Sequence, residues 1–128
     1  MFRSRKRAWS VAVFVLVVAA SILAVNIGPA LGARYRVRAT EEDTWSPTVR
    51  EIVKGDRIVW RNPTDDFHNV KSQGSNWSYF ENLPEGETAA KRFRRTGTFK
   101  YRCSLHSSIE NGVCHGMCGR IKVLRPPQ

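Results

Sequence analysis

The sequence predicts an all-β domain, a β-sandwich, preceded by an N-terminal hydrophobic helix. Two observations predict the sandwich. Apolar and polar residues alternate with a period of two in about eight short runs, and turn-forming residues separate these runs. After residue 33 no stretch has the period of a helix. We therefore expect two parts, a hydrophobic segment over residues 1–33 and one small β domain over residues 34–128.

The N-terminal segment has the pattern of a targeting sequence. Four basic residues within positions 3–7 precede an apolar run over residues 8–27, and small residues follow it. This pattern predicts a secretory signal cleaved near Gly32, but the run is also long enough to remain as a membrane anchor. Residues 1–33 are thus expected to be a signal peptide or a signal anchor, and residues 8–27 would form the membrane tether. Either one places the domain outside the cytoplasm: secreted, periplasmic or on the outer face of the cell membrane.

The first three expected strands are the clearest. Arginine and apolar residues alternate over residues 34–39, as in a strand with one face in water. A second run, residues 49–53, ends at Lys54-Gly55-Asp56. A third, residues 57–61, ends at a turn that contains Asn62-Pro63.

The remaining runs alternate less regularly. They cover residues 67–71, 77–80, 89–95, 98–103 and 119–124. Glycine marks the turn before the fourth of them, and a Pro-Pro pair follows the last. These runs complete the predicted sandwich.

The charge of the chain does not indicate nucleic-acid binding. The formal net charge is +10, from 21 basic and 11 acidic residues. Four of the basic residues and none of the acidic ones lie in residues 1–33, which leaves the domain about six excess positive charges. Its arginines alternate along strands as solvated residues do, and the chain has no zinc-finger spacing or glycine-rich phosphate loop. We expect the charge to attract an acidic protein partner or an anionic envelope, and we expect no nucleic-acid partner.

Most of the chain's soft metal-binding residues are concentrated in one segment. A thiolate, imidazoles and a thioether are the ligands preferred by copper that cycles between Cu(I) and Cu(II). Two His and one Cys with a weak axial Met form a blue-copper electron-transfer site. In such a site Cys103 would be the anionic thiolate ligand, and His68 and His106 would be the nitrogen ligands. The thioether of Met117 would be the weak axial ligand.

Several segments resemble a known family. They are Trp45-Ser46-Pro47, Lys54–Asn62, His68-Asn69-Val70, Gly97–Cys103, His106 and Gly116–Val123. Together, from about Trp45 to Val123, they resemble the plastocyanin/azurin group of cupredoxins, which are small blue, type 1 copper proteins. The resemblance implies a Greek-key β-sandwich that holds one copper ion near one end and transfers single electrons. An enzyme with a second copper site would need more histidines than the three in this chain.

The resemblance also implies roles for neighbouring residues. The ring edge of His106 would lie near the surface as the electron exit. Asn69 would link the two ligand loops, toward Ser104, and its hydrogen bonds would tune the potential. As partners the resemblance implies a redox protein donor or acceptor, with the chain itself a monomer.

One part of the chain departs from the family pattern. Ten residues separate His106 from Met117, where family members usually have only a few. The inserted segment, Ser107 to His115, adds a further candidate ligand. Met117 is therefore the least secure ligand, because His115 or a backbone oxygen could take the axial position.

The odd number of cysteines fits this ligand assignment. Three cysteines cannot all form disulfides within the chain. If Cys103 binds copper, Cys114 and Cys118 remain as a candidate disulfide, which would fix the turn that carries Met117. Three pairings are formally possible, and the two that use Cys103 would remove the copper ligand.

Two other functions remain open at this stage. Cys103, His106, Cys114 and Cys118 have spacings that suit a structural zinc site. That assignment leaves His68 without a role. Alternatively, the same copper ligands could belong to an exported copper-binding protein or copper chaperone.

Overall fold

The computed structural model describes residues 32–128. The predicted signal peptide or anchor helix falls almost wholly on residues 1–31 and so lies outside the described residues. In the described part of the chain, no helix has the length and apolar character needed to cross a membrane.

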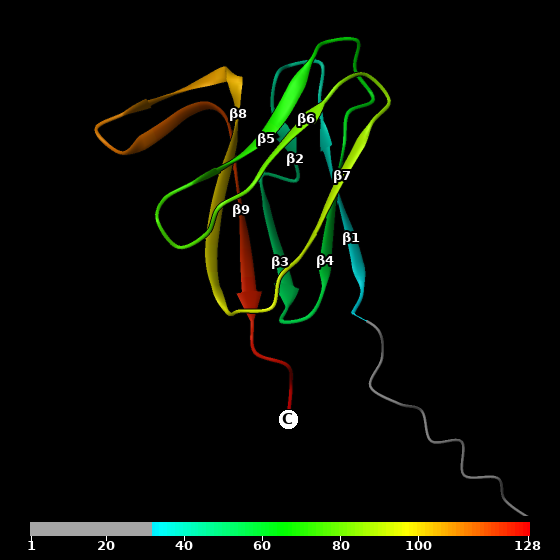
Figure 1. Ribbon diagram of the computed structural model, residues 1–128, viewed down its shortest axis with the longest axis vertical. Helices are drawn as coiled ribbons and strands as arrows, with labels where there is room; N and C mark the ends of the chain where they lie inside the picture. The colour runs from blue at the N-terminus through cyan, green and yellow to red at the C-terminus, as the bar shows by residue number, and fades with distance from the viewer. Residues whose placement is uncertain (1–31) are drawn as a thin grey trace, which may run out of the picture.

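The described residues form nine β-strands in two sheets, as expected for a sandwich (Figure 1). One sheet has the strand order β2-β1-β4-β7 and the other β3-β9-β8-β5-β6. β1 pairs parallel with β4, and β3 pairs parallel with β9. The chain between the strands of each parallel pair passes through the other sheet. The bounds are β1 Arg34–Ala39, β2 Trp45–Ser46, β3 Val49–Val53, β4 Arg57–Arg61, β5 His68–Gln73, β6 Phe80–Leu83, β7 Thr88–Arg92, β8 Gly97–Glu110 and β9 Val113–Leu124.

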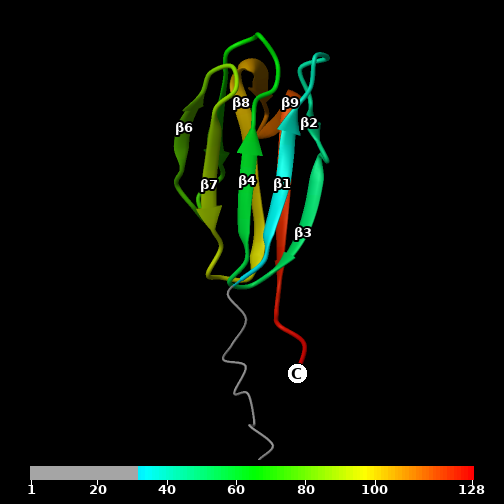
Figure 2. The ribbon, with the colours of Figure 1, turned by 90° about the vertical axis from the view of Figure 1, so that its right-hand side faces the viewer.

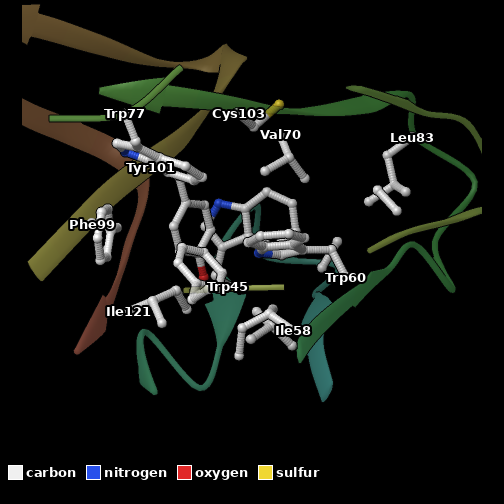
Figure 3. Close-up of a cluster of buried hydrophobic side chains, with 14 of the residues drawn as sticks. Trp45, Ile58, Trp60, Val70, Trp77, Leu83, Phe99, Tyr101, Cys103 and Ile121 are labelled. Carbon is white, nitrogen blue, oxygen red and sulfur yellow. The ribbon is translucent and has the colours of Figure 1, made fainter. Parts of the chain in front are cut away.

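The core lies between the two sheets and is rich in aromatic rings (Figure 3). The alternation along β4 turns Ile58 and Trp60 inward, where both are fully buried. The ring of Trp60 meets that of Tyr101 edge-on, with centroids 5.3 Å apart, and Trp45 lies 5.6 Å from the same tyrosine ring. This packing fixes β8, which carries Tyr101, against the opposite sheet.

The segment expected to be an inserted loop, Ser107 to His115, is instead a β-hairpin. β8 continues to Glu110 and β9 begins at Val113, and the two strands pair from Ser107↔Gly116 to Glu110↔Val113. Asn111 and Gly112 form the turn with positive φ angles of 51° and 76°. Asn-Gly is the preferred dipeptide for such a two-residue turn, because it adopts positive φ at low cost. The hairpin projects from one end of the sandwich (Figure 1).

The strand expected over residues 77–80 is wrong in its position. Residues 77–79 have no strand pairing, and β6 begins only at Phe80. The aromatic side chains cover the core instead of alternating: Trp77 and Tyr79 stack at 5.9 Å, and the Trp77 indole N–H donates to the carbonyl of Lys100 at 2.9 Å. Aromatic content favours strands in sequence reasoning, but here tertiary packing decides the local conformation.

Candidate metal centre

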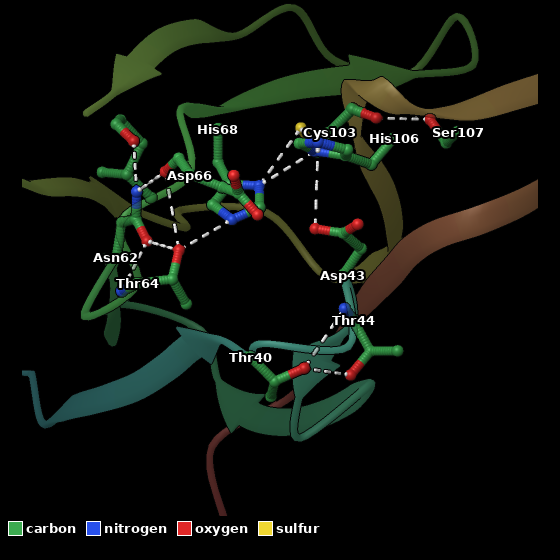
Figure 4. A network of polar contacts seen from close by, with 11 residues as sticks. Thr40, Asp43, Thr44, Asn62, Thr64, Asp66, His68, Cys103, His106 and Ser107 are labelled. Carbon is green, nitrogen blue, oxygen red and sulfur yellow. Dashed lines mark hydrogen bonds and ion pairs between the residues drawn. The ribbon is translucent and has the colours of Figure 1, made fainter. Parts of the chain in front are cut away.

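Three of the four predicted ligands converge at one end of the sandwich (Figure 4). The two imidazole Nδ1 atoms of His68 and His106 lie 3.1 Å apart. The Sγ of Cys103 lies 3.7 Å from the first and 3.4 Å from the second. A point equidistant from the three atoms lies about 2 Å from each, which is the length of a metal–nitrogen bond in proteins. The donor set and its spacing therefore fit a single metal ion.

A large bulge in β8 brings two of these residues together. Arg102 pairs with Cys118 and Ser107 pairs with Gly116, so the four residues from Cys103 to His106 lie opposite Met117 alone. The Ser107 hydroxyl donates to the Cys103 carbonyl and so closes the bulge. Because the chain bends here, Cys103 and His106 turn toward the same point, as bulges near functional sites commonly do.

The register also places the predicted axial ligand. Met117 is the residue of β9 that faces the bulge, and its side chain is fully buried. The alternative ligand, His115, pairs with Ser108 in the projecting hairpin, and its side chain is 56% exposed. Its Nε2 lies 3.8 Å from a carboxylate oxygen of Glu110. The structure thus places Met117, which is buried, opposite the bulge, and His115, which is exposed, farther out in the hairpin.

A chain of hydrogen bonds fixes the tautomer of His68 (Figure 4). The Asn62 amide donates to the carbonyls of Asp66 and Leu83, so its oxygen must face Thr64. The Thr64 hydroxyl donates to that oxygen at 2.6 Å, and it can then only accept from the Nε2–H of His68, 3.1 Å away. The proton of His68 is therefore on Nε2, and the lone pair of Nδ1 faces the thiol.

Burial keeps His68 neutral. The side chain is fully buried, and this burial lowers its pKa below the ordinary 6.5, with a further lowering from the neighbouring His106. The carboxylates of Asp43 and Asp66 act in the opposite direction. A neutral imidazole with a free Nδ1 lone pair is the form that binds a metal ion.

Asn69 and Ser104 lie where the resemblance implies. The Asn69 amide donates to the Ser104 hydroxyl at 2.8 Å, and its oxygen accepts from the Ser104 backbone N–H, also at 2.8 Å. These two bonds connect the start of β5 to the residue that follows Cys103. They therefore hold His68 and Cys103 at a fixed separation.

The outer edge of the cluster faces a carboxylate. The Nε2 of His106 lies 3.8 Å from an oxygen of Asp43, in the loop between β1 and β2. The side chain of His106 is 26% exposed, so its ring edge reaches the surface at this end of the molecule.

Cys114 and Cys118 form a disulfide, and Cys103 is a buried free thiol. The disulfide spans the segment that contains Gly116 and Met117. Oxidised cysteines cannot ligate zinc, because the ligand is the thiolate. The zinc site that used all three cysteines with His106 is therefore wrong.

Sequence reasoning missed three residues that shape the site. The sequence places Asn62 in a turn and at the end of a family-like segment, and it assigns no role to Thr64 or Asp43. Thr64 is only four residues from His68, but the Asn62 side chain that orients it is held by the Leu83 carbonyl, and that long-range contact has no signal in the local sequence. The hairpin, by contrast, had a local signal in Asn111-Gly112.

Comparison with known proteins identifies the fold. No protein-family model matches the sequence, and no curated protein matches it. Solved structures do match. The purple cupredoxin from Nitrosopumilus maritimus aligns with a TM-score of 0.55 and 23% identity, over 70% of this chain and 98% of its own. Pseudoazurin from Methylobacterium extorquens AM1 aligns with a TM-score of 0.55 and 20% identity, over 70% of this chain and 74% of its own.

A copper enzyme is similar over a small part of its length. The copper-containing nitrite reductase from Thermus scotoductus SA-01 aligns with a TM-score of 0.59 and 21% identity, over 76% of this chain but only 23% of the reductase.

A mutant of amicyanin in its reduced state aligns with a TM-score of 0.57 and 21% identity, over 75% of this chain and 86% of its own. The chain therefore has the cupredoxin fold.

Proposed function

We propose that this cupredoxin-fold chain is a mononuclear type 1 copper protein that carries single electrons between redox partners outside the cytoplasm. The observation that carries the proposal is the convergence of His68 Nδ1, Cys103 Sγ and His106 Nδ1 around one point. A bound copper ion would supply one-electron chemistry between Cu(I) and Cu(II). His68, Cys103 and His106 would hold the ion, and Met117 would be a fourth, weaker ligand.

The residues around the site hold the ligands rather than a substrate. Cys103 and His68 are fully buried, so the protein excludes water from most of the ligand set. Thr64 hydrogen-bonds to the ligand His68, and Asn69 hydrogen-bonds to Ser104, the neighbour of the ligand Cys103. Ligands held in this way need move little when the charge of the ion changes, which suits repeated electron transfer.

Several features favour a carrier over an enzyme or a chaperone. The chain has three histidines; two converge at the site and the third is exposed beside Glu110. One remaining histidine is too few to build the second copper site of a copper enzyme. A buried thiolate suits retention of copper better than its delivery to another protein. The disulfide supports an extracytoplasmic location, because disulfides persist in oxidising compartments.

The electron would enter and leave through the exposed edge of His106. Phe67 and Leu105 each precede one of the two ligand histidines and are 48% and 57% exposed. Exposed apolar side chains beside the ligand suit transient docking of a redox protein, since they bring its cofactor close without a large polar barrier.

Voltammetry and a transfer assay together test the carrier proposal. The copper-loaded protein is expected to give a reversible one-electron wave and to retain its copper when mixed with a copper-free acceptor protein. Rapid quantitative transfer of copper, with no reversible wave, would instead establish the chaperone alternative.

Met117→Gln is expected to keep copper bound and to lower the reduction potential. A glutamine oxygen is a harder ligand than a thioether and favours Cu(II) over Cu(I). Voltammetry of the two proteins measures the shift, and His115→Gln is the matched control, expected to leave the potential unchanged. An unshifted potential in Met117→Gln would remove Met117 from the ligand set.

Thr64→Val is expected to weaken copper binding by about 10-fold or more, because the Nε2–H of His68 loses its acceptor. Valine has nearly the shape of threonine, so the core packing is kept. The control is Thr48→Val, which removes a hydroxyl that donates to the Trp45 carbonyl, away from the ligands. Competition with a copper chelator measures both affinities; equal values would show that Thr64 does not position His68.

A further inference from the structure

The outer face of the sheet β2-β1-β4-β7 carries an array of arginines. Figure 2 shows the ribbon of this sheet face-on. Inward side chains of β1 and β4, such as Val37 and Trp60, are fully buried. Their neighbours along each strand therefore point outward. Six of these outward residues are arginines, here called the arginine face: Arg34, Arg36, Arg38, Arg57, Arg61 and Arg92.

The strand registers place these charges directly beside one another. Arg57 lies between Arg34 on β1 and Arg92 on β7, and Arg38 pairs with Arg61. Like charges opposite one another on a sheet are destabilising. The repulsion between these arginines therefore lowers the stability of the fold, which a mixed or neutral surface would not do.

No ion pair within the described residues neutralises these arginines. In residues 32–128, no lysine or arginine side chain lies within 4.0 Å of a carboxylate oxygen; the two ion-pair contacts found there both involve histidine. An array of like charges with no internal partner fits an external anion. Guanidinium groups suit phosphate in particular, which they bind through paired hydrogen bonds.

The arginine face is turned away from the metal centre. His68, Cys103, His106 and Met117 all belong to strands of the other sheet. A redox protein docked on the arginine face would therefore lie across the sandwich from the strands that carry the ligands. If the proposed function holds, the arginine face therefore does not serve electron transfer.

The composition of the face favours a membrane over a protein partner. The other outward residues of β4 and β7 are Val59, Thr88 and Ala90, so this part of the face has no aromatic side chain. Protein interfaces rely on buried aromatic anchors in pockets. An anionic bilayer presents diffuse negative charge and needs only basic residues opposite it. The predicted tether, residues 8–27, also precedes β1 closely in the chain.

We propose that the arginine face binds the headgroups of anionic phospholipids, so that the sandwich lies with this sheet against the membrane. The metal centre is in the sheet on the other side, and the His106 edge stays accessible to a redox protein. The interaction is electrostatic and weakens as salt is added.

Chemical footprinting of arginine tests this proposal. The full chain is reconstituted into vesicles of neutral phosphatidylcholine, or of phosphatidylcholine with phosphatidylglycerol, and treated with phenylglyoxal. Mass spectrometry then gives the modification rate of each arginine. At low salt, Arg36, Arg38 and Arg61 are expected to react about fivefold more slowly, or slower still, on the anionic vesicles. Arg120, exposed on the other sheet, is the internal control and is expected to react equally on both.

Added salt and charge-reversal variants test whether the protection is electrostatic and whether it depends on the arginine face. The protection is expected to disappear at high ionic strength. It is also expected to be lost at Arg34 and Arg57 in the triple variant Arg36→Glu, Arg38→Glu, Arg61→Glu, but kept in a control variant with Arg94→Glu, Arg95→Glu and Arg120→Glu. Equal rates on neutral and anionic vesicles in the unaltered chain would overturn the proposal. So would protection that appears only when an acidic protein is added, which would assign the face to a protein partner. Neither outcome depends on copper binding.

Discussion

Cys103→Ser is expected to abolish the visible colour of the oxidised protein and most of its copper affinity. The colour of a type 1 site comes from the copper–thiolate bond, and a serine hydroxyl is not deprotonated under ordinary conditions and cannot replace it. The position is fully buried, and serine is close to cysteine in size, so the fold should be retained. Visible absorption and copper analysis after reconstitution measure the effect.

The matched control removes the other two cysteines. The double variant Cys114→Ser, Cys118→Ser is expected to keep its colour, because the disulfide is not a ligand. It should lose about 2 kcal/mol of unfolding free energy at most, since the disulfide closes only a short ring. If Cys103→Ser kept the colour, or if the control lost it, the ligand assignment would be wrong.

Gly116→Ala is expected to have the second-largest effect, through the backbone rather than through a ligand. Gly116 has a φ of +95°, and a Cβ added there would overlap the carbonyl oxygen of His106. That oxygen belongs to the bulge that aims Cys103 and His106, so relief of the overlap must displace a ligand residue. We expect a loss of about 3 kcal/mol or more in unfolding free energy and a weaker copper site.

Gly112→Ala separates strain from overlap. Gly112 also has a positive φ, +76°, but an added Cβ would meet no atom within 4 Å. It should cost only about 1–2 kcal/mol, the penalty of a left-handed conformation, and leave the spectrum unchanged. Chemical unfolding of both variants, with and without copper, checks the difference. Equal losses in the two variants would show that the contact between Gly116 and the His106 backbone does not maintain the site.

The alternation of arginine and apolar residues over residues 34–39 was sufficient to predict β1, because one face is wet and the other buried. The same reasoning worked for β3 and β4. It failed at Trp77, whose ring packs on the core instead of alternating. Local pattern determines a strand only where burial also alternates.

At the site, residue chemistry indicated His68, Cys103 and His106, and the structure brings their ligand atoms together. The residues that contact these ligands and hold them in place were harder to predict. Thr64 lies only four residues before His68, but the Asn62 side chain that orients its hydroxyl is held in turn by the Leu83 carbonyl in β6. Asp43 comes close to His106 from a third element. Contacts of this kind depend on tertiary structure and leave no periodic signal in the sequence.

The ultraviolet–visible spectrum of the purified, oxidised protein, taken together with its metal content, decides whether the chain is a type 1 copper protein. We expect one copper ion per chain and an intense blue or green colour that bleaches on reduction and returns on reoxidation. A colourless protein that holds stoichiometric zinc after native purification, or that binds copper without the intense band, would contradict it.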